Sequence, residues 1–226
     1  MCRLFLADSL AIIDIAAVLP DVFSELEASM GGHGNGIYET QTNNIIKAVS
    51  MPTSFAAAYL QEVAASSSPQ NWFAFHTRIA SSGNADDDGL LHPRRVANRG
   101  AVVMQNGTWS SWHRHVPNAL NDTSAIALVM SRRGVRKAML SKQLAGAGSL
   151  IAITAKDKMA HIVRRSSSQP LVIANTKSMG TLVISEITDS LRKLVRNSTG
   201  LKVGEYRRLA VGPDGLANIV EVQHAR

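Results

Sequence analysis

Short apolar runs of strand character recur along this chain and are separated mostly by short turns. In chain order they are Arg3–Leu6, Trp72–Ile79, Ala101–Met104, Leu150–Thr154, His161–Val163, Leu171–Ala174, Leu182–Ile184, Tyr206–Val211 and Ala217–Val222. The last two flank Gly212-Pro213-Asp214-Gly215, a hairpin signal because Pro fixes φ and Gly accepts a positive φ. Since neighbouring runs follow one another without an intervening helix, they predict antiparallel sheets rather than alternating βαβ units.

Helical periodicity is clearest in four segments that lie between the clusters of strands. These segments are Asp21–Ser29, Thr53–Ala65, Asp122–Leu140 and Glu186–Val195. Gly134 interrupts the third segment and predicts a break there. Amphipathic helices placed between groups of antiparallel strands predict an α+β fold in which helices cover the sheets.

The composition sets the class of protein. A chain of 226 residues with 45% apolar side chains can fill a core, which excludes a mainly disordered protein. Its loop-like segments are too short to serve as interdomain linkers, so we expect a single domain over residues 1–226. The lone cysteine excludes a disulfide framework and a Cys-rich zinc site.

The location and the partners follow from charge and hydropathy. The chain has no apolar run long enough to span a membrane, and Asp8 and Asp14 interrupt the apolar start, so we expect a cytoplasmic protein without a secretory signal. The formal net charge of +7 favours an acidic partner, but the basic residues are spread along the chain. We therefore do not expect nucleic-acid binding, and the oligomeric state stays open.

Cys2 is the most informative position for chemistry. It follows Met1, and Cys is small enough for an aminopeptidase to remove the initiator methionine before it. The new terminus would carry a nucleophilic thiol and an α-amine with a reference pKa of about 7.7–8.0, which can serve as a general base. The alternative is an ordinary cysteine near a frayed chain end.

Three further sites could contact a substrate, and each has a structural alternative. Arg78 ends an apolar strand, where its planar guanidinium suits a carboxylate or a plain ion pair. Asn106 and Gly107 follow another apolar strand, either as a simple turn or as two donors of an oxyanion hole. Asp122 precedes a helix, either as its N-cap or as a partner for an ammonium group.

The histidines do not predict a metal site. Those at positions 33, 113, 115, 161 and 224 show no convincing ligand spacing, so we expect neither a metal nor another cofactor. The aromatic and basic segment Trp109–His115 could contact nucleic acid. We favour a wall beside the Asn106-Gly107 turn instead.

Taken together, these features resemble a known family. The residues that carry the resemblance are, in chain order, Met1–Phe5, His76–Arg78, His92-Pro93, Asn106–Thr108 and Asn121–Thr123. This set is similar to the class II glutamine amidotransferase domain, a member of the N-terminal nucleophile (Ntn) hydrolases. The strand series over Ser149–Thr188 is similar as well. The resemblance thus covers most of the chain and implies a four-layer α/β/β/α sandwich of two antiparallel sheets.

The resemblance implies a glutaminase-type amidohydrolase. Cys2 would attack the side-chain amide of glutamine, or of a γ-glutamyl amide, with its own α-amine as base and without a cofactor. Asn106 and Gly107 would hold the oxyanion of the intermediate. A glutamyl thioester would form and ammonia would leave for a separate synthetase or ligase, because no second domain is expected here.

The same resemblance implies the substrate contacts. Arg78 would bind the α-carboxylate of glutamine and Asp122 its α-ammonium, while Ser81 lies where relatives place a residue near the carboxylate. Many members begin with Cys-Gly, whereas this chain has Cys2-Arg3, which is closer to the stand-alone branch of the family. The departures leave an alternative open, a catalytically impaired protein of the same fold that binds a partner through its basic surface.

Overall fold

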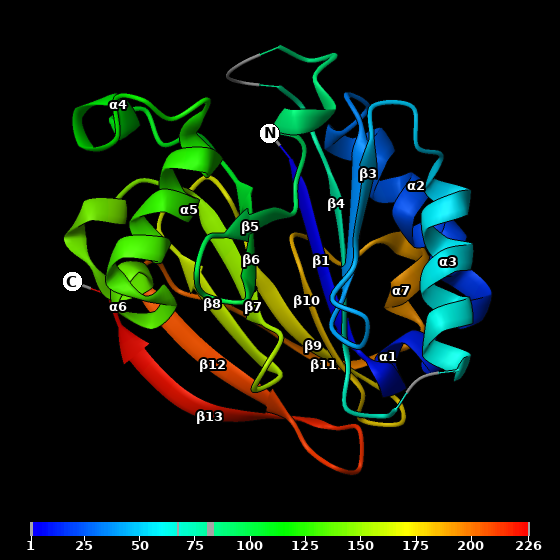
Figure 1. The fold of residues 1–226 in the computed structure, drawn as a ribbon. Coiled ribbons are helices and arrows are strands. Elements are labelled where there is room, and N and C mark those ends of the chain that lie inside the picture. The colour runs from blue at the N-terminus through cyan, green and yellow to red at the C-terminus, as the bar shows by residue number, and fades with distance from the viewer. Residues whose placement is uncertain (1, 67, 81–83, 226) are drawn as a thin grey trace.

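Two antiparallel sheets form the centre of the computed structural model, which describes residues 2–66, 68–80 and 84–225 (Figure 1). The seven-stranded sheet has, in spatial order, β11 (Val195–Gly200), β9 (Val172–Thr176), β10 (Thr181–Ile184), β1 (Arg3–Asp8), β4 (Trp72–Thr77), β2 (Asn35–Glu39) and β3 (Ile45–Ala48). The six-stranded sheet has β13 (Ala217–His224), β12 (Glu205–Val211), β8 (Met159–Arg164), β7 (Ser149–Thr154), β6 (Ala101–Asn106) and β5 (Arg94–Val96). Every paired strand is antiparallel.

Helices cover the outer face of each sheet. The seven-stranded sheet carries α1 (Ser9–Asp14), α2 (Leu19–Met30), α3 (Thr53–Ser66) and α7 (Asp189–Arg192). The six-stranded sheet carries α4 (Trp112–His115), α5 (Asp122–Arg133) and α6 (Val135–Leu140). Short 3-10 turns are η1 (Ala16–Val18), η2 (Asp88–Leu90) and η3 (Lys142–Leu144). The order helix, sheet, sheet, helix confirms the predicted α+β sandwich.

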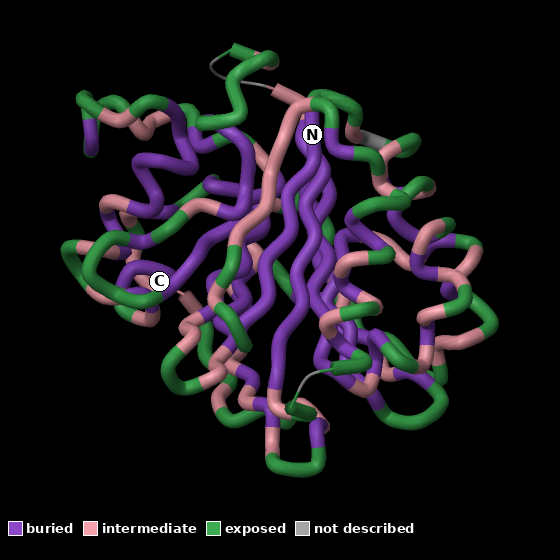
Figure 2. The backbone as a smooth tube through the Cα atoms, turned by 45° about the vertical axis from the view of Figure 1, so that its right-hand side comes forward, coloured by how far each residue is buried: buried purple, intermediate pink, exposed green. Residues whose placement is uncertain are grey.

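Three apolar clusters hold the four layers together. One lies between α1–α3 and the seven-stranded sheet, one between the two sheets, and one between the six-stranded sheet and α5–α6. The backbone of the central strands is buried, while exposed backbone lies in the outer loops (Figure 2). Burying apolar surface on both faces of both sheets supplies most of the stability of such a fold.

The two-residue period of the strands decides which side chains face the space between the sheets. Leu4 and Leu6 of β1 pack between the sheets, whereas Phe5 packs against the helices. Continued backward, the same alternation puts Cys2 on the inter-sheet side. It also puts Arg78 on that side, in step with Trp72 and Ala74 of β4.

Most of the predicted elements are present, with two kinds of exception. The nine predicted strand runs all coincide with strands, and Gly134, with φ of 83°, separates α5 from α6 as expected. The predicted helix over Glu186–Val195 is wrong, because only the single turn α7 is helical and Val195 begins β11. Ser185 and Glu186 are instead bound to β1, which keeps this stretch from starting a helix. The strands β2, β3, β5 and β11 were not predicted.

None of the helices in the described residues is long and apolar enough to cross a membrane. Within the same residues, no group of three His, Cys, Asp or Glu side chains is placed to hold a metal ion.

Candidate active site

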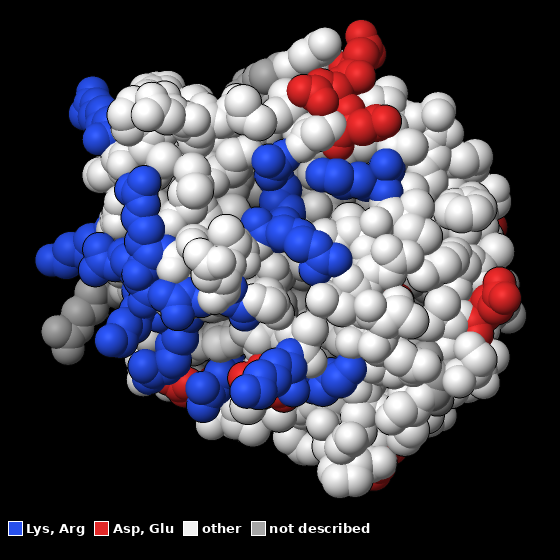
Figure 3. Space-filling model, in the orientation of Figure 1, with Lys and Arg blue, Asp and Glu red and all other residues white. Residues whose placement is uncertain are grey.

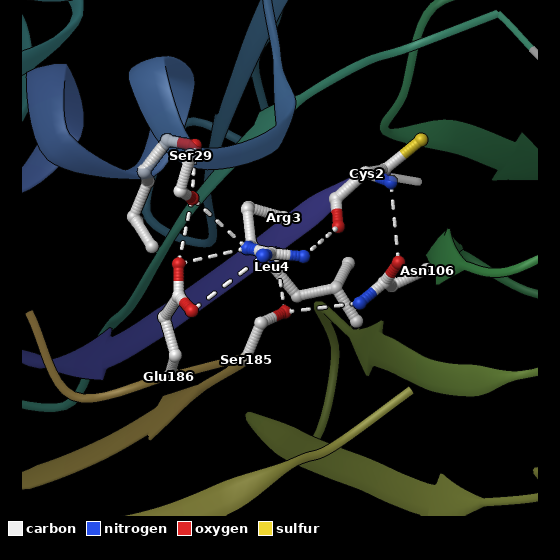
Figure 4. Close-up of polar contacts among 8 residues, drawn as sticks. Cys2, Arg3, Leu4, Ser29, Asn106, Ser185 and Glu186 are labelled. Atoms are coloured by element: carbon white, nitrogen blue, oxygen red, sulfur yellow. Dashed lines mark hydrogen bonds and ion pairs between the residues drawn. The ribbon is translucent and has the colours of Figure 1, made fainter. Parts of the chain in front are cut away.

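Cys2 lies directly before β1, at the end of the gap between the two sheets. Its side chain is buried, with 6% exposed. Its backbone nitrogen donates to Asn106 Oδ1 at 3.1 Å, and its thiol donates to the Ile79 carbonyl at 3.6 Å (Figure 4). The first of these contacts joins β1 of one sheet to β6 of the other. Cys2 is therefore fixed in the structure and not part of a frayed end.

Arg3 anchors the same end of β1 on the opposite face of the sheet. Its Nε lies 2.9 Å from Glu186 Oε1 and 3.1 Å from Ser29 Oγ, and its Nη1 donates to the Cys2 carbonyl at 3.4 Å. The next residue, Leu4, donates its N–H to Ser185 Oγ at 2.9 Å. Figure 4 shows that the Cys2 sulfur points away from this cluster. The backbone around the thiol is thus held while the thiol itself faces elsewhere.

The electrostatic surroundings keep the Cys2 thiol protonated. Burial raises its pKa, and the Asp122 carboxylate raises it further, while the Arg78 guanidinium acts in the opposite direction. A thiol becomes a strong nucleophile only on losing its proton. A catalytic Cys2 therefore needs a base beside it.

The two predicted oxyanion-hole residues, Asn106 and Gly107, lie in different surroundings. Asn106 is fully buried; its Oδ1 accepts from Cys2, and its Nδ2 lies 3.4 Å from Ser185 Oγ. Gly107 follows with φ of 138°, where a Cβ would lie 2.8 Å from the Cα of Gly148, so only glycine fits. No acceptor for the Gly107 N–H is found among the described residues.

Arg78 follows β4 and is buried beside the thiol. Its backbone is paired with the segment before β2, since its N–H donates to the Gly34 carbonyl at 3.0 Å. Its guanidinium Nη1 lies 3.1 Å from the Asn84 carbonyl and 3.5 Å from the Ala85 carbonyl. These carbonyls are neutral acceptors that orient the fork without cancelling its charge.

Asp122 is the first residue of α5, and it is not the N-cap. Asn121 caps the helix by accepting from the Ser124 N–H at 2.8 Å. The Asp122 carboxylate accepts from Trp109 N at 3.0 Å, Thr123 N at 2.9 Å and Gln105 Nε2 at 3.2 Å. Burial raises its pKa, and these donors oppose the rise. Three donors thus hold the Asp122 carboxylate, which forms no salt bridge with any residue that the structure describes.

These residues meet at one small pocket between the ends of the two sheets. Its walls are formed by Cys2, Arg78, Ile79, His92, Gly107, Asn121, Asp122 and Thr123. One cation, one anion and one thiol thus face the same space, although Cys2 precedes β1, Arg78 follows β4 and Asp122 begins α5. Asn106 lies behind Cys2 and does not line the pocket. Ser81 lies outside the described residues.

Gln105 and His92 contribute to this site, although the sequence did not single them out for it. Gln105 faces the helix layer, where its amide bridges Asp122 Oδ2 and the Ala147 carbonyl and accepts from Thr123 Oγ1 at 2.6 Å. His92 Nδ1 lies 2.8 Å from His76 Nε2, and burial lowers the pKa of both rings. A buried glutamine in an apolar strand was the available signal for the first.

Similarity to solved structures defines the class of fold. The chain has the fold of class II glutamine amidotransferases, that is, the Ntn-hydrolase fold, which confirms the predicted resemblance at the level of the fold. No protein-family profile matches the chain, and no curated protein sequence matches it.

Three structural neighbours give the extent of the similarity. A glutamine phosphoribosylpyrophosphate amidotransferase from B. subtilis superposes with a TM-score of 0.65 at 15% identity, and an allosteric regulatory enzyme of purine biosynthesis with 0.65 at 14%. Both alignments cover 100% of this chain and 49% of the neighbour, so the chain spans about half of these enzymes. A glutamine aminotransferase class-II domain protein from Silicibacter pomeroyi aligns over 100% of both chains, with a TM-score of 0.54 at 13% identity.

Proposed function

We propose that this protein is a glutaminase-type amidohydrolase of the Ntn class that acts on glutamine or on a γ-glutamyl amide. The observation that carries the proposal is the meeting of Cys2, Arg78 and Asp122 in one pocket. The α-carbon of glutamine bears one carboxylate and one ammonium, so it needs one fixed cation and one fixed anion. In this proposal Arg78 binds the carboxylate and Asp122 the ammonium, and Ser81 assists near the carboxylate.

Catalysis begins once Met1 has been removed. The Cys2 sulfur attacks the γ-carbonyl carbon, and the thiol proton passes to the α-amine, which acts as the base. The nitrogen of Cys2 already rests on Asn106 Oδ1, a contact that orients it. An amine that titrates near neutral pH meets the need of a buried, protonated thiol for an adjacent base.

The tetrahedral intermediate places negative charge on the former carbonyl oxygen. The Gly107 N–H is one donor for this oxygen. Asn106 Nδ2 is the proposed second donor, and the amide must turn toward the pocket to reach it, because Nδ2 lies 3.4 Å from Ser185 Oγ in the structure. The α-ammonium then returns its proton to the leaving nitrogen, and ammonia or an amine departs. Water hydrolyses the glutamyl thioester, which releases glutamate and regenerates the thiol.

The fate of the ammonia belongs to the same proposal. The chain matches about half of the two larger enzymes with the same fold. We propose that the acceptor chemistry lies on a separate synthetase or ligase, or that the enzyme hydrolyses a γ-glutamyl compound on its own. We further propose that no cofactor takes part and that the protein works in the cytoplasm.

Glutamate release from glutamine and from γ-glutamyl amides tests the proposal, with Cys2→Ala as the decisive variant. The purified protein is first weighed intact, so that only chains beginning with Cys2 are assayed. The wild-type protein is expected to release glutamate and to gain the mass of one glutamyl group when the reaction is quenched in acid. The Cys2→Ala variant is expected to do neither. Equal rates in the two proteins would eliminate Cys2 as the nucleophile.

The alternative of a binding protein rests on the surface charge. Lys and Arg side chains gather over the region of α6, β12 and β13 in Figure 3. A protein without glutaminase activity that binds an acidic partner, with an affinity that falls steeply with salt, would favour this alternative.

A further inference from the structure

A cationic cleft lies where the edge strands of the two sheets approach each other. Its walls are Asn44, Ile45 and Lys47 from the β3 region and Pro93, Arg94 and Arg95 from the β5 region. The cleft has a volume of about 410 Å3 and is open to solvent. Figure 3 shows a group of basic side chains over β5 and β3, apart from those over α6.

The three cations of this cleft are held in place by neutral oxygen atoms. Arg95 donates to the Asn43 side-chain oxygen at 2.9 Å and to the Asn43 carbonyl at 2.6 Å. Lys47 Nζ donates to the Leu91 carbonyl at 3.1 Å, and Arg94 donates to the Gly89 carbonyl. Among the residues that the structure describes, none of the three forms a salt bridge. The cleft thus holds positive charges in fixed positions, and Asp87 acts on Lys47 and Arg94 without forming an ion pair with either among the described residues.

The partial burial of Lys47 changes its pKa. Burial lowers the pKa of Lys47 to about 8, and the positive charge of Arg94 adds to the effect. Asp87 and Asp88 lie near enough to oppose the shift, but neither lines the cleft. An anion bound in the cleft would be attracted by all three cations, and this attraction would offset their mutual repulsion.

We propose that Lys47, Arg94 and Arg95 form a binding site for a small phosphorylated molecule. After the contacts above, each guanidinium keeps at least three of its five N–H donors and Lys47 keeps two of three, enough to surround a phosphate dianion. Two guanidinium forks and one ammonium suit the several oxygens of a phosphate better than the two of a carboxylate. The hollow shape favours a small molecule over an extended polyanion.

The cleft adjoins the Cys2 pocket through consecutive residues. His92 lines the pocket, and Pro93 and Arg94, which follow it, line the cleft. A phosphorylated ligand would therefore bind beside the candidate active site without occupying it. The proposal does not depend on the glutaminase function, because it concerns binding alone.

Isothermal titration of the full chain with inorganic phosphate and with glycerol phosphate tests the site. The test variant is Lys47→Gln/Arg95→Gln, and the matched control is Arg132→Gln/Lys137→Gln, which removes the same charge from exposed positions outside the cleft. The expected result is binding by wild type, at least tenfold weaker binding by the test variant, and a change of less than twofold in the control. Equal weakening in both variants, or no binding by wild type at low ionic strength, would overturn the proposal.

Two further measurements keep the test decisive. If the double variant fails to fold, Arg95→Gln alone replaces it, because Arg95 is exposed and its loss leaves the core intact. NMR titration of Lys47 in wild type should show its pKa rising when phosphate is added, and an unchanged value counts against the site. A short DNA duplex serves as a polyanion control. If it binds more tightly than glycerol phosphate, and both double variants weaken its binding equally, the ligand is a polyanion and the proposed small-molecule site is wrong.

Discussion

Replacing Gly107 by alanine tests the proposed oxyanion hole most directly. The new Cβ would lie 2.8 Å from the Cα of Gly148 and 3.4 Å from both the Ala147 carbonyl oxygen and the side chain of Gln169. Carbon atoms pack best at about 3.5–4.0 Å, so the turn must open by about 0.7–1.2 Å. The N–H of Gly107 moves with it.

Both stability and rate should respond to this shift. An alanine at φ of 138° costs about 1–3 kcal/mol of folding free energy, and the displaced neighbours add to that cost. A displacement of about 1 Å at a reacting centre costs about 100-fold in rate. We therefore expect Gly107→Ala to lose about 100-fold in kcat for glutamate release, and to unfold at lower urea concentration.

Gly146→Ala is the matched control. Gly146 also has a positive φ, 78°, but an added Cβ there meets nothing within 4 Å. This variant should lose about 1 kcal/mol of stability and keep its kcat. If Gly107→Ala keeps a kcat within about threefold of the control, while urea unfolding shows the expected destabilisation, the Gly107 N–H is not an oxyanion donor.

Three further predictions follow from the charges in the structure. Arg78→Lys should raise the KM for glutamine by about 10–100-fold with a smaller change in kcat, because a lysine cannot replace a bidentate fork; steady-state kinetics that show an unchanged KM would count against Arg78 as the carboxylate site. Asp122→Asn should lower the pKa of Cys2 and Arg78→Gln should raise it, as read from the pH dependence of alkylation by iodoacetamide; shifts of the opposite sign would contradict the described surroundings of the thiol. Burial raises the pKa of Asp8 from 3.8 to about 6, so the folded chain holds this proton more tightly and the free energy of unfolding should fall by about 2–3 kcal/mol between pH 4 and pH 6, then level off. Urea unfolding of Asp8→Asn should lack this fall, and an identical slope in the variant would refute the assignment.

The sequence predicted the central part of the fold well for a physical reason. The predicted strands β1, β4, β6, β7, β8 and β10 are buried on both faces, so their apolar character is continuous. The strands β3 and β11 are half-buried or exposed at sheet edges, and β5 is short and mostly charged. Their pairing partners, rather than their own composition, make them strands.

The error at Glu186–Val195 has a similar origin. An acidic first turn after Ser185 is a helix signal, but both residues are used by β1 in the folded chain. The hydroxyl of Ser185 accepts from Leu4 N, and the carboxylate of Glu186 binds Arg3. Contacts between residues more than 180 positions apart thus override the local preference.

In the site, too, the sequence predicted the local features but not the contacts between residues far apart in the chain. Cys2, Arg78, Gly107 and Asp122 could be named as candidates because each has a chemical reason to stand at a strand end or helix start. Their meeting in one pocket could not be read from the sequence, since it depends on the pairing of β1 with β4 and on the packing of the two sheets. The orientation of the Asn106 amide depends on its contact with Ser185, so it could not be predicted from the sequence either.

The burial of Cys2 also limits which group could accept the thiol proton in the proposed reaction. A thiol on the surface could lose its proton to water, but burial and the charge of Asp122 hold the pKa of Cys2 above its ordinary value. His76 and His92 contact each other through His92 Nδ1 and His76 Nε2, and burial lowers the pKa of both rings, which makes them poor proton acceptors. The backbone nitrogen of Cys2 stays beside its own thiol and is oriented by Asn106. That nitrogen becomes a base only when no residue precedes it, so removal of Met1 would control activity through a single proton acceptor.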